Sequence, residues 1–233
     1  MLADKRCLIT GGTRGLGLAL AAAFARHGAK VAITYCTYDD DAAAATVAIA
    51  AASPERIEPR VFKGSVADSQ HVRDVVTQLA KDWGGIDVLV NNAAIVTHFQ
   101  WGVPPWPAIK DMESSFWDKV MGTNLRGTFL CTKYALPHME ARGGGHVVST
   151  MGGGNPEVTG SAAYAVSKDA IRTFTRFVAE EERAHGICVV MISPGTQIAT
   201  ELAPDEARGR MAGPEFVGER FVLAAQAPLE LSG

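Results

Sequence analysis

Short apolar runs alternate along the chain with longer segments of helical periodicity. The apolar and β-forming runs predict six strands at 7–9, 31–35, 60–63, 86–90, 146–150 and 187–192. The segments between and after them predict helices at 16–26, 39–52, 69–83, 116–134 or beyond, 162–185 and 213–225. Glycines at several of the boundaries, such as Gly28 and Gly186, indicate where helices end.

The order of these elements predicts the fold. The fourth run, Ile86–Val90, is nearly all apolar, which is typical of a parallel strand buried on both faces. Strand and helix alternate six times without a linker, so we expect one α/β domain over residues 1–233. Its predicted architecture is a doubly wound, Rossmann-type parallel sheet between two helical layers.

Composition and charge exclude several classes of partner. The net charge of the 233-residue chain is -3, and no long basic segment suggests nucleic acid or an anionic membrane. The N-terminus has no signal-peptide pattern, and no apolar run approaches the roughly 20 residues of a membrane span. The four cysteines lie far apart, and no histidine pairs with another ligand at metal spacing. We therefore expect a soluble, cytoplasmic protein with reduced cysteines and no metal site.

A glycine-rich stretch, Thr10–Gly17, follows the first predicted strand and leads into the first predicted helix. In that context Gly11, Gly15 and Gly17 would let the backbone approach a pyrophosphate at the helix N-terminus. The spacing G-x3-G-x-G differs from the common dinucleotide fingerprint. Taken alone, the stretch is also compatible with an ordinary tight turn.

A second pattern, Tyr164-Ala-Val-Ser-Lys168, places a phenol and an amine one turn apart on a helix. An ammonium beside a phenol favours the phenolate, so we expect a lowered pKa for Tyr164. Such a tyrosine could transfer protons near neutral pH. An isolated pair of this kind also occurs by chance on surface helices.

Taken together, these patterns carry a family resemblance. The glycine loop after the first strand, Asn91-Asn92-Ala93 after the fourth, and Tyr164 with Lys168 after the fifth occur here in one order. With them, the chain resembles the short-chain dehydrogenase/reductase family of single-domain type over nearly its whole length. The resemblance implies an NAD(P)-dependent oxidoreductase that interconverts a small or ring-bearing ketone and an alcohol. It also implies a homodimer or homotetramer. The family has a further strand at the end of the domain, and Leu231–Gly233 resembles only the residues that lead into it, so we expect an incomplete terminal strand.

The resemblance assigns catalytic roles by position. Tyr164 matches the acid/base, Lys168 the residue that tunes it and holds the nicotinamide ribose, and Asn124 an asparagine that relays a proton through water. The family's serine usually lies thirteen residues before the tyrosine, where this chain has Met151, which cannot donate a hydrogen bond. Matching the fifth strand instead gives the role to Thr150, with Ser149 or loss of the function as alternatives.

The cofactor site follows in the same way. The residues matched to it are Gly11, Thr13, Arg14, Gly15, Leu16, Gly17, Tyr35, Ser65, Val66, Asn92, Ala93, Tyr164, Lys168, Pro194, Gly195, Ile198 and Thr200. Ser65 replaces an aspartate that commonly contacts adenine. Tyr35 ends the second strand without the carboxylate that would repel a 2′-phosphate, and Arg14 is placed to meet one, so NADP(H) is favoured over NAD(H). A merely solvated Arg14, or the nearby Asp39–Asp41, would weaken this preference.

The segment Val96–Pro107 is rich in proline and aromatic residues and cannot form a regular element. Phe99, Trp101 and Trp106 are candidates for a substrate-pocket wall, but they could equally fold the loop on itself or bury a subunit contact. Two other functions remain open from sequence: a nucleotide-binding sensor or scaffold that has lost the chemistry, and an epimerase or dehydratase on the same fold.

Overall fold

The computed structural model describes residues 2–95, 107–153, 159–195, 198–199 and 209–233. Six strands form one sheet: β1 (Arg6–Ile9), β2 (Lys30–Tyr35), β3 (Arg60–Lys63), β4 (Val88–Asn91), β5 (Gly145–Thr150) and β6 (Ile187–Ile192). Their order is β3-β2-β1-β4-β5-β6, and all neighbours are parallel. This order confirms the predicted doubly wound sheet.

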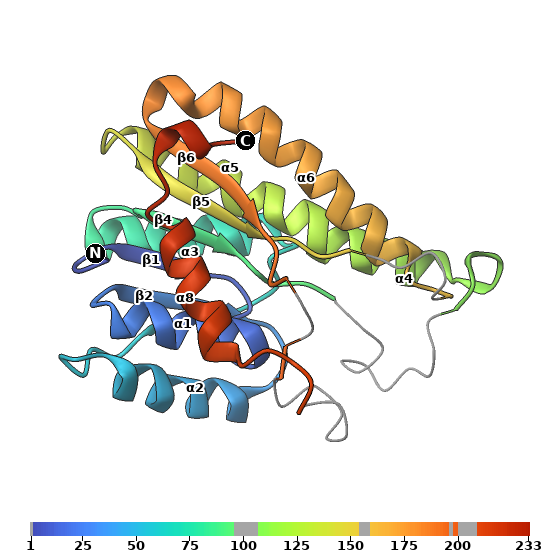
Figure 1. Cartoon of the computed structure of the whole chain (residues 1–233), viewed down its shortest axis with the longest axis horizontal. Helices are drawn as coiled ribbons and strands as arrows, with labels where there is room; N and C mark the ends of the chain where they lie inside the picture. Colours follow the sequence, from blue (N-terminus) through green and yellow to red (C-terminus); the bar gives the residue numbers. More distant parts are fainter. Residues whose placement is uncertain (1, 96–106, 154–158, 196–197, 200–208) are drawn as a thin grey trace.

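Helices cover both faces of the sheet (Figure 1). One layer holds α1 (Gly15–Arg26), α2 (Asp39–Ala52) and α8 (Pro214–Ala224), and the other holds α3 (Ser69–Trp83), α5 (Gly127–Glu140) and α6 (Ala162–Glu182). The shorter α4 (Ser114–Met121) precedes α5 and contacts α6. The molecule therefore has the three layers expected of this fold.

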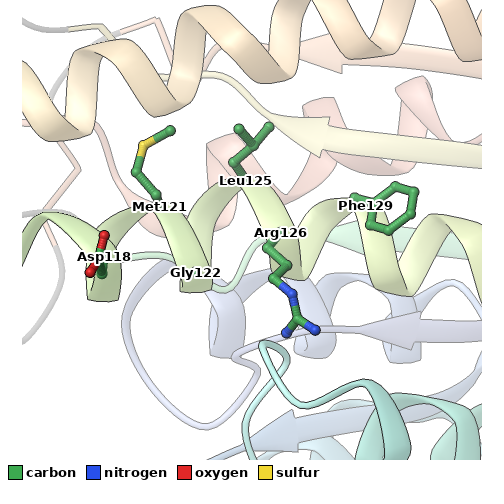
Figure 2. A pocket seen from close by; sticks show the side chains of 6 residues that line it. All are labelled: Asp118, Met121, Gly122, Leu125, Arg126 and Phe129. Carbon is green, nitrogen blue, oxygen red and sulfur yellow. The ribbon is translucent and has the colours of Figure 1, made fainter. Parts of the chain in front are cut away.

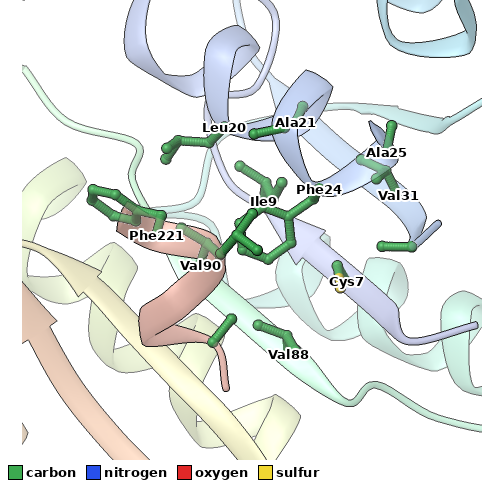
Figure 3. Close-up of a cluster of buried hydrophobic side chains, with 14 of the residues drawn as sticks. Cys7, Ile9, Leu20, Ala21, Phe24, Ala25, Val31, Val88, Val90 and Phe221 are labelled. Carbon is green, nitrogen blue, oxygen red and sulfur yellow. The ribbon is translucent and has the colours of Figure 1, made fainter. Parts of the chain in front are cut away.

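Strand alternation divides the core in two. Cys7 and Ile9 of β1 point into the α1/α8 side, whereas Leu8 between them points into the α3/α5 side. On the first side, Phe24 and Phe221 are fully buried against these strand residues (Figure 3). Gly218 allows the close packing of α8 on α1, because a Cβ there would lie 2.8 Å from the Cβ of Ala23.

The long helix predicted from residue 116 is interrupted. Between α4 and α5 the backbone makes a π-helical turn over Gly122–Arg126. The helix predicted to reach His185 ends at Glu182 and continues as a short 3-10 turn over Arg183–His185. Periodicity alone does not reveal either change, because both keep the chain helical.

The last residues lie beside β6. A 3-10 turn spans Leu229–Leu231, after which Ser232 Oγ accepts a hydrogen bond from the Val189 backbone N–H at 2.9 Å. The Gly233 N–H donates to the Val189 carbonyl at 3.0 Å. These bonds occupy the side of β6 that no other strand covers in the described part of the chain.

Among the helices of the described residues, none combines the length and apolar character needed to cross a membrane.

Candidate active site

Predicted site residues gather at the carboxyl edge of the sheet. The sheet order reverses between β1 and β4, whose connections leave in opposite directions. In an open α/β sheet this is where ligands bind, in the crevice beyond the strand ends. The glycine loop follows β1, Asn92 follows β4, and the segment that leads to Tyr164 follows β5.

The glycine loop is tightly folded. Gly11 and Gly15 have φ of +65° and +56°, in the left-handed region that favours glycine. A Cβ on Gly17 would overlap the carbonyl oxygen of Gly11 and lie 2.7 Å from Asn92 Nδ2. The N-cap residue of α1 is Arg14, whose own side chain makes no capping hydrogen bond. A backbone this close at the start of a helix fits a phosphate group of a dinucleotide.

The segment after β4 is bonded to this loop. Thr10 Oγ1 accepts hydrogen bonds from the backbone N–H groups of Asn92 and Ala93, both at 3.0 Å. In return, Asn92 Nδ2 donates to the carbonyls of Thr10 at 3.0 Å and Gly11 at 3.2 Å. The predicted glycine loop and the Asn-Asn-Ala segment are thus bonded together at this edge of the sheet.

The ends of β2 and β3 carry a cluster of charges. Asp39 accepts a hydrogen bond from Tyr35 Oη at 2.7 Å and pairs with Lys63 Nζ at 2.7 Å. Arg14 lies 4.7 Å over the Tyr38 ring, and its Nη1 is 3.7 Å from Asp41 Oδ2. Lys63 lowers the pKa of Asp39, with a second contribution from the Tyr35 hydroxyl. The sequence analysis did not identify Tyr38 as a contact of Arg14 or Lys63 as the partner of Asp39, because only the folded chain brings these residues together.

Tyr164 and Lys168 occupy successive turns at the start of α6, as predicted. The Lys168 side chain is buried, its Nζ donates to the Thr150 carbonyl at 2.8 Å, and it lies 5.7 Å from the Tyr164 ring centre. Burial lowers the pKa of Lys168 to about 8 and raises the pKa of Tyr164 to about 12. The expected lowering of the Tyr164 pKa is therefore wrong here, because desolvation of the phenolate dominates.

Asn124 lies in the π-helical turn and is fully buried. Its Oδ1 accepts from the Ile95 N–H at 2.8 Å, and its Nδ2 donates to the Ile95 carbonyl at 3.2 Å and to Ser167 Oγ at 3.0 Å. Ser167 Oγ in turn donates to the Tyr164 carbonyl at 2.7 Å. Asn124 thereby ties the segment after β4 to α6 through Ser167, a residue that the sequence analysis missed. Its proton-relay role stays a prediction.

The two candidate hydroxyls at the end of β5 point to opposite faces of the sheet. Ser149 Oγ is 3.5 Å from Asn91 Nδ2, on the α5 side. Thr150 Oγ1 is buried and has no hydrogen-bond partner among the described residues. The Tyr164 hydroxyl lies against Gly152, where an added Cβ would overlap Oη. The orienting role of Thr150 stays a prediction.

The remaining predicted cofactor residues are partly described. Thr13 is buried, Leu16 packs against the core, Ser65 Oγ accepts from the Ala67 N–H at 3.2 Å, and Val66 is buried. The Pro194 carbonyl accepts from Arg220 Nη1 at 3.3 Å, Gly195 has φ of +83°, and Ile198 pairs with Ala212 in an isolated bridge. Thr200, Phe99, Trp101 and Trp106 lie outside the described residues.

A separate groove of about 430 Å³ lies along α4, the π-helical turn and α5 (Figure 2). Its lining consists of Asp118, Met121, Gly122, Leu125, Arg126 and Phe129. None of these is a predicted site residue, and neither Tyr164 nor Lys168 is part of the lining. In the described part of the chain, Glu140, Glu182 and His185 bring three potential metal ligands together, also away from this edge.

Comparison with known proteins identifies the family. The family model for short chain dehydrogenases matches residues 5–210. The chain belongs to the short-chain dehydrogenase family. It is therefore an NAD(P)-dependent oxidoreductase, as the resemblance implied.

Individual members of this family are similar over most of their length. A 3-oxoacyl-[acyl-carrier-protein] reductase, FabG of Staphylococcus aureus (strain N315), is 30% identical over 217 residues, which cover 91% of this chain and 82% of that protein. A metagenomic short-chain oxidoreductase solved in complex with NADP has a TM-score of 0.80 at 26% identity, covering 98% of this chain and 93% of the other. A short-chain type dehydrogenase/reductase from Mycobacterium marinum has a TM-score of 0.83 at 29% identity, covering 99% and 91%.

Proposed function

We propose that this short-chain dehydrogenase interconverts a small or ring-bearing ketone and the corresponding alcohol, with Tyr164 as the proton donor and acceptor. The observation that carries the proposal is the placement of Tyr164 and buried Lys168 beyond β5, at the same edge as the glycine loop. When bound there, the nicotinamide cofactor supplies or accepts the hydride.

The protein's part is to hold and move one proton. With a pKa of about 12, the Tyr164 hydroxyl is protonated at neutral pH, which is the state needed to donate to a ketone oxygen. Lys168 is held against the Thr150 carbonyl, and its charge would stabilise the phenolate that remains. We assign Asn124 the support of this pair, since it bonds to Ser167 in the same turn of α6.

Thr150 is the proposed donor that orients the substrate oxygen. Its hydroxyl has no partner among the described residues, whereas Ser149 Oγ lies against Asn91. A buried hydroxyl without a partner is uncommon in native structures, and a bound ligand is one way to satisfy it.

NADP(H) is the proposed cofactor in preference to NAD(H). Arg14 lies over the Tyr38 ring, and its Nη1 is 3.7 Å from Asp41 Oδ2, so its guanidinium is placed to exchange that carboxylate for a 2′-phosphate. The metagenomic relative with a TM-score of 0.80 was solved with NADP. Gly11, Thr13, Gly15, Leu16 and Gly17 would hold the phosphates, with Asn92, Ala93, Pro194, Gly195, Ile198 and Thr200 along the rest of the cofactor.

The test is the loss of one hydroxyl. Purified protein with NADPH or NADH is assayed on ketones, quinones and a 3-oxoacyl thioester, the last because a relative carries that name. Tyr164→Phe should lower kcat at least about 10²-fold, the low end for general acid catalysis, while NADPH still binds. Tyr134→Phe, a change on α5 at a tyrosine bonded to Ser69, should leave turnover unchanged.

Each alternative gives a different result. Full turnover by the Tyr164→Phe variant would refute the proposed mechanism. Cofactor binding without turnover of any compound by the wild type would favour a sensor or scaffold. Conversion of a substrate without net change in cofactor absorbance would favour an epimerase or dehydratase.

A further inference from the structure

Gly152 lies two residues beyond β5, opposite the first turn of α6. A Cβ built on it would overlap the Tyr164 hydroxyl oxygen and would lie 2.8 Å from Cζ and 3.1 Å from Cε1 of the same ring. All three nearest atoms thus belong to the functional end of one side chain. The space that a side chain would occupy at residue 152 is the space that the Tyr164 hydroxyl occupies.

The backbone gives no other reason for a glycine here. Neither Gly152 nor Gly153 has a positive φ, so either could carry a side chain without backbone strain. At Gly153 an added Cβ would meet no atom of the described residues within 4 Å. Gly152, which is half-buried, thus has Tyr164 against it, whereas the neighbouring Gly153 is exposed.

We propose that Gly152 is a positioning residue: it leaves the space that the Tyr164 hydroxyl occupies, and any side chain at residue 152 would displace this hydroxyl. The inference rests on the proposed function, in which Tyr164 carries the proton. A side chain at 152 must push the ring end away, and a displacement of about 1 Å at a reacting group can reduce a rate about 10²-fold. The rule includes serine: although its hydroxyl could donate to a substrate oxygen, its Cβ would still overlap the Tyr164 hydroxyl.

The experiment compares Gly152→Ala and Gly152→Ser with Gly153→Ala. Both changes at 152 should lower kcat about 10²-fold with NADPH affinity unchanged, while Gly153→Ala should match the wild type. Equal activity of Gly152→Ala and Gly153→Ala would overturn the proposal. A higher kcat in Gly152→Ser than in the wild type would overturn it as well.

A second readout follows the tyrosine itself. Tyrosine ionisation is recorded by ultraviolet absorbance up to about pH 11, with the Tyr164→Phe variant of each protein as reference. With a pKa of about 12, Tyr164 should stay protonated in the wild type and in Gly153→Ala. In Gly152→Ala the displaced hydroxyl should reach solvent and titrate nearer to 10, its ordinary value. An unchanged titration in Gly152→Ala would contradict the proposal that Gly152 positions the Tyr164 hydroxyl.

A double-mutant cycle covers the case in which Gly152→Ala folds poorly. The Tyr164→Phe change removes the hydroxyl that the new Cβ would overlap, so Gly152→Ala should lower Tm less in that background. Equal losses in both backgrounds would overturn the inference. Tyr164→Phe alone separates the two proposals: its full activity refutes the proposed function, whereas its inactivity together with a fully active Gly152→Ala refutes only the role of Gly152.

Discussion

Lys168 and Tyr164 show how burial, rather than proximity, sets proton affinities at the residue scale. Burial shifts both pKa values toward the neutral form, because desolvation penalises the ammonium of Lys168 and the phenolate of Tyr164. The spacing of four residues correctly predicted that the two would share one face of a helix. It could not predict the sign of the tyrosine shift, because the pattern of one helix does not show what packs against it, such as Gly152 at the Tyr164 hydroxyl.

The lowered pKa of Lys168 predicts a pH-dependent stability. The pKa is about 8 in the folded protein against an ordinary 10.5, so between these values the unfolded chain binds more protons than the folded one. The free energy of unfolding should therefore rise with pH in this window, by at most about 1.4 kcal/mol per pH unit for one group. Tyr164, with its raised pKa, acts in the opposite direction only above about pH 10.

Urea unfolding at several pH values from about 8 to 10 measures this dependence. The wild type should gain stability relative to Lys168→Gln as the pH rises, whereas Lys133→Gln, at an exposed lysine of α5, should run parallel to the wild type. Parallel curves for the wild type and Lys168→Gln would show that the lysine is not desolvated in solution.

At the scale of elements, the sequence predicted the regular segments best. The bounds of α2, α3, β3 and β6 agree with the prediction, and most others differ by one or two residues. The π-helical turn was not predicted, although it directs Asn124 toward Ile95 and Ser167. One extra residue shifts the helical periodicity by one position, and α4 before it has only eight residues, too few to establish a period from which the shift could be recognised.

The bridge from this turn to α6 can be tested through Ser167. Its hydroxyl joins Asn124 Nδ2 to the Tyr164 carbonyl and is fully buried. Ser167→Ala should lower the free energy of unfolding by about 1–3 kcal/mol, because it leaves buried polar atoms with fewer partners. Denaturant unfolding at neutral pH measures the loss.

Thr175 provides a matched control two turns further along α6. It is also buried, but its Oγ1 has no hydrogen-bond partner among the described residues. Thr175→Val, which replaces this hydroxyl by a methyl group of similar size, should be neutral or stabilising. Equal destabilisation by the two changes would mean that the Ser167 bonds contribute little.

At the scale of the whole molecule, the alternation of strands and helices was sufficient to predict the sheet and its two helical layers. The order of motifs along that sheet then predicted the family. Contacts between distant units were not predictable in the same way. Arg14 follows β1, Asp39 and Asp41 begin α2, and Lys63 ends β3, so their pairing exists only once three strand-helix units have assembled.

The proposed preference for NADP(H) rests on this assembled cluster. Arg14 should bind a 2′-phosphate in place of Asp41, so NADPH should bind more tightly and raise Tm more than NADH at equal concentration. Arg14→Ala should weaken NADPH binding about tenfold or more, since a hydrogen bond to a charged group is worth about 1.5–3 kcal/mol. The same change should leave NADH binding unchanged.

The control is Arg26→Ala, at the other end of α1 in a pair with Glu219, which should affect the binding of neither cofactor. Titration calorimetry with both cofactors measures this. Equal losses for NADPH and NADH in Arg14→Ala would place the arginine at a part of the site that the two cofactors share, and the preference for NADP(H) would then need another source.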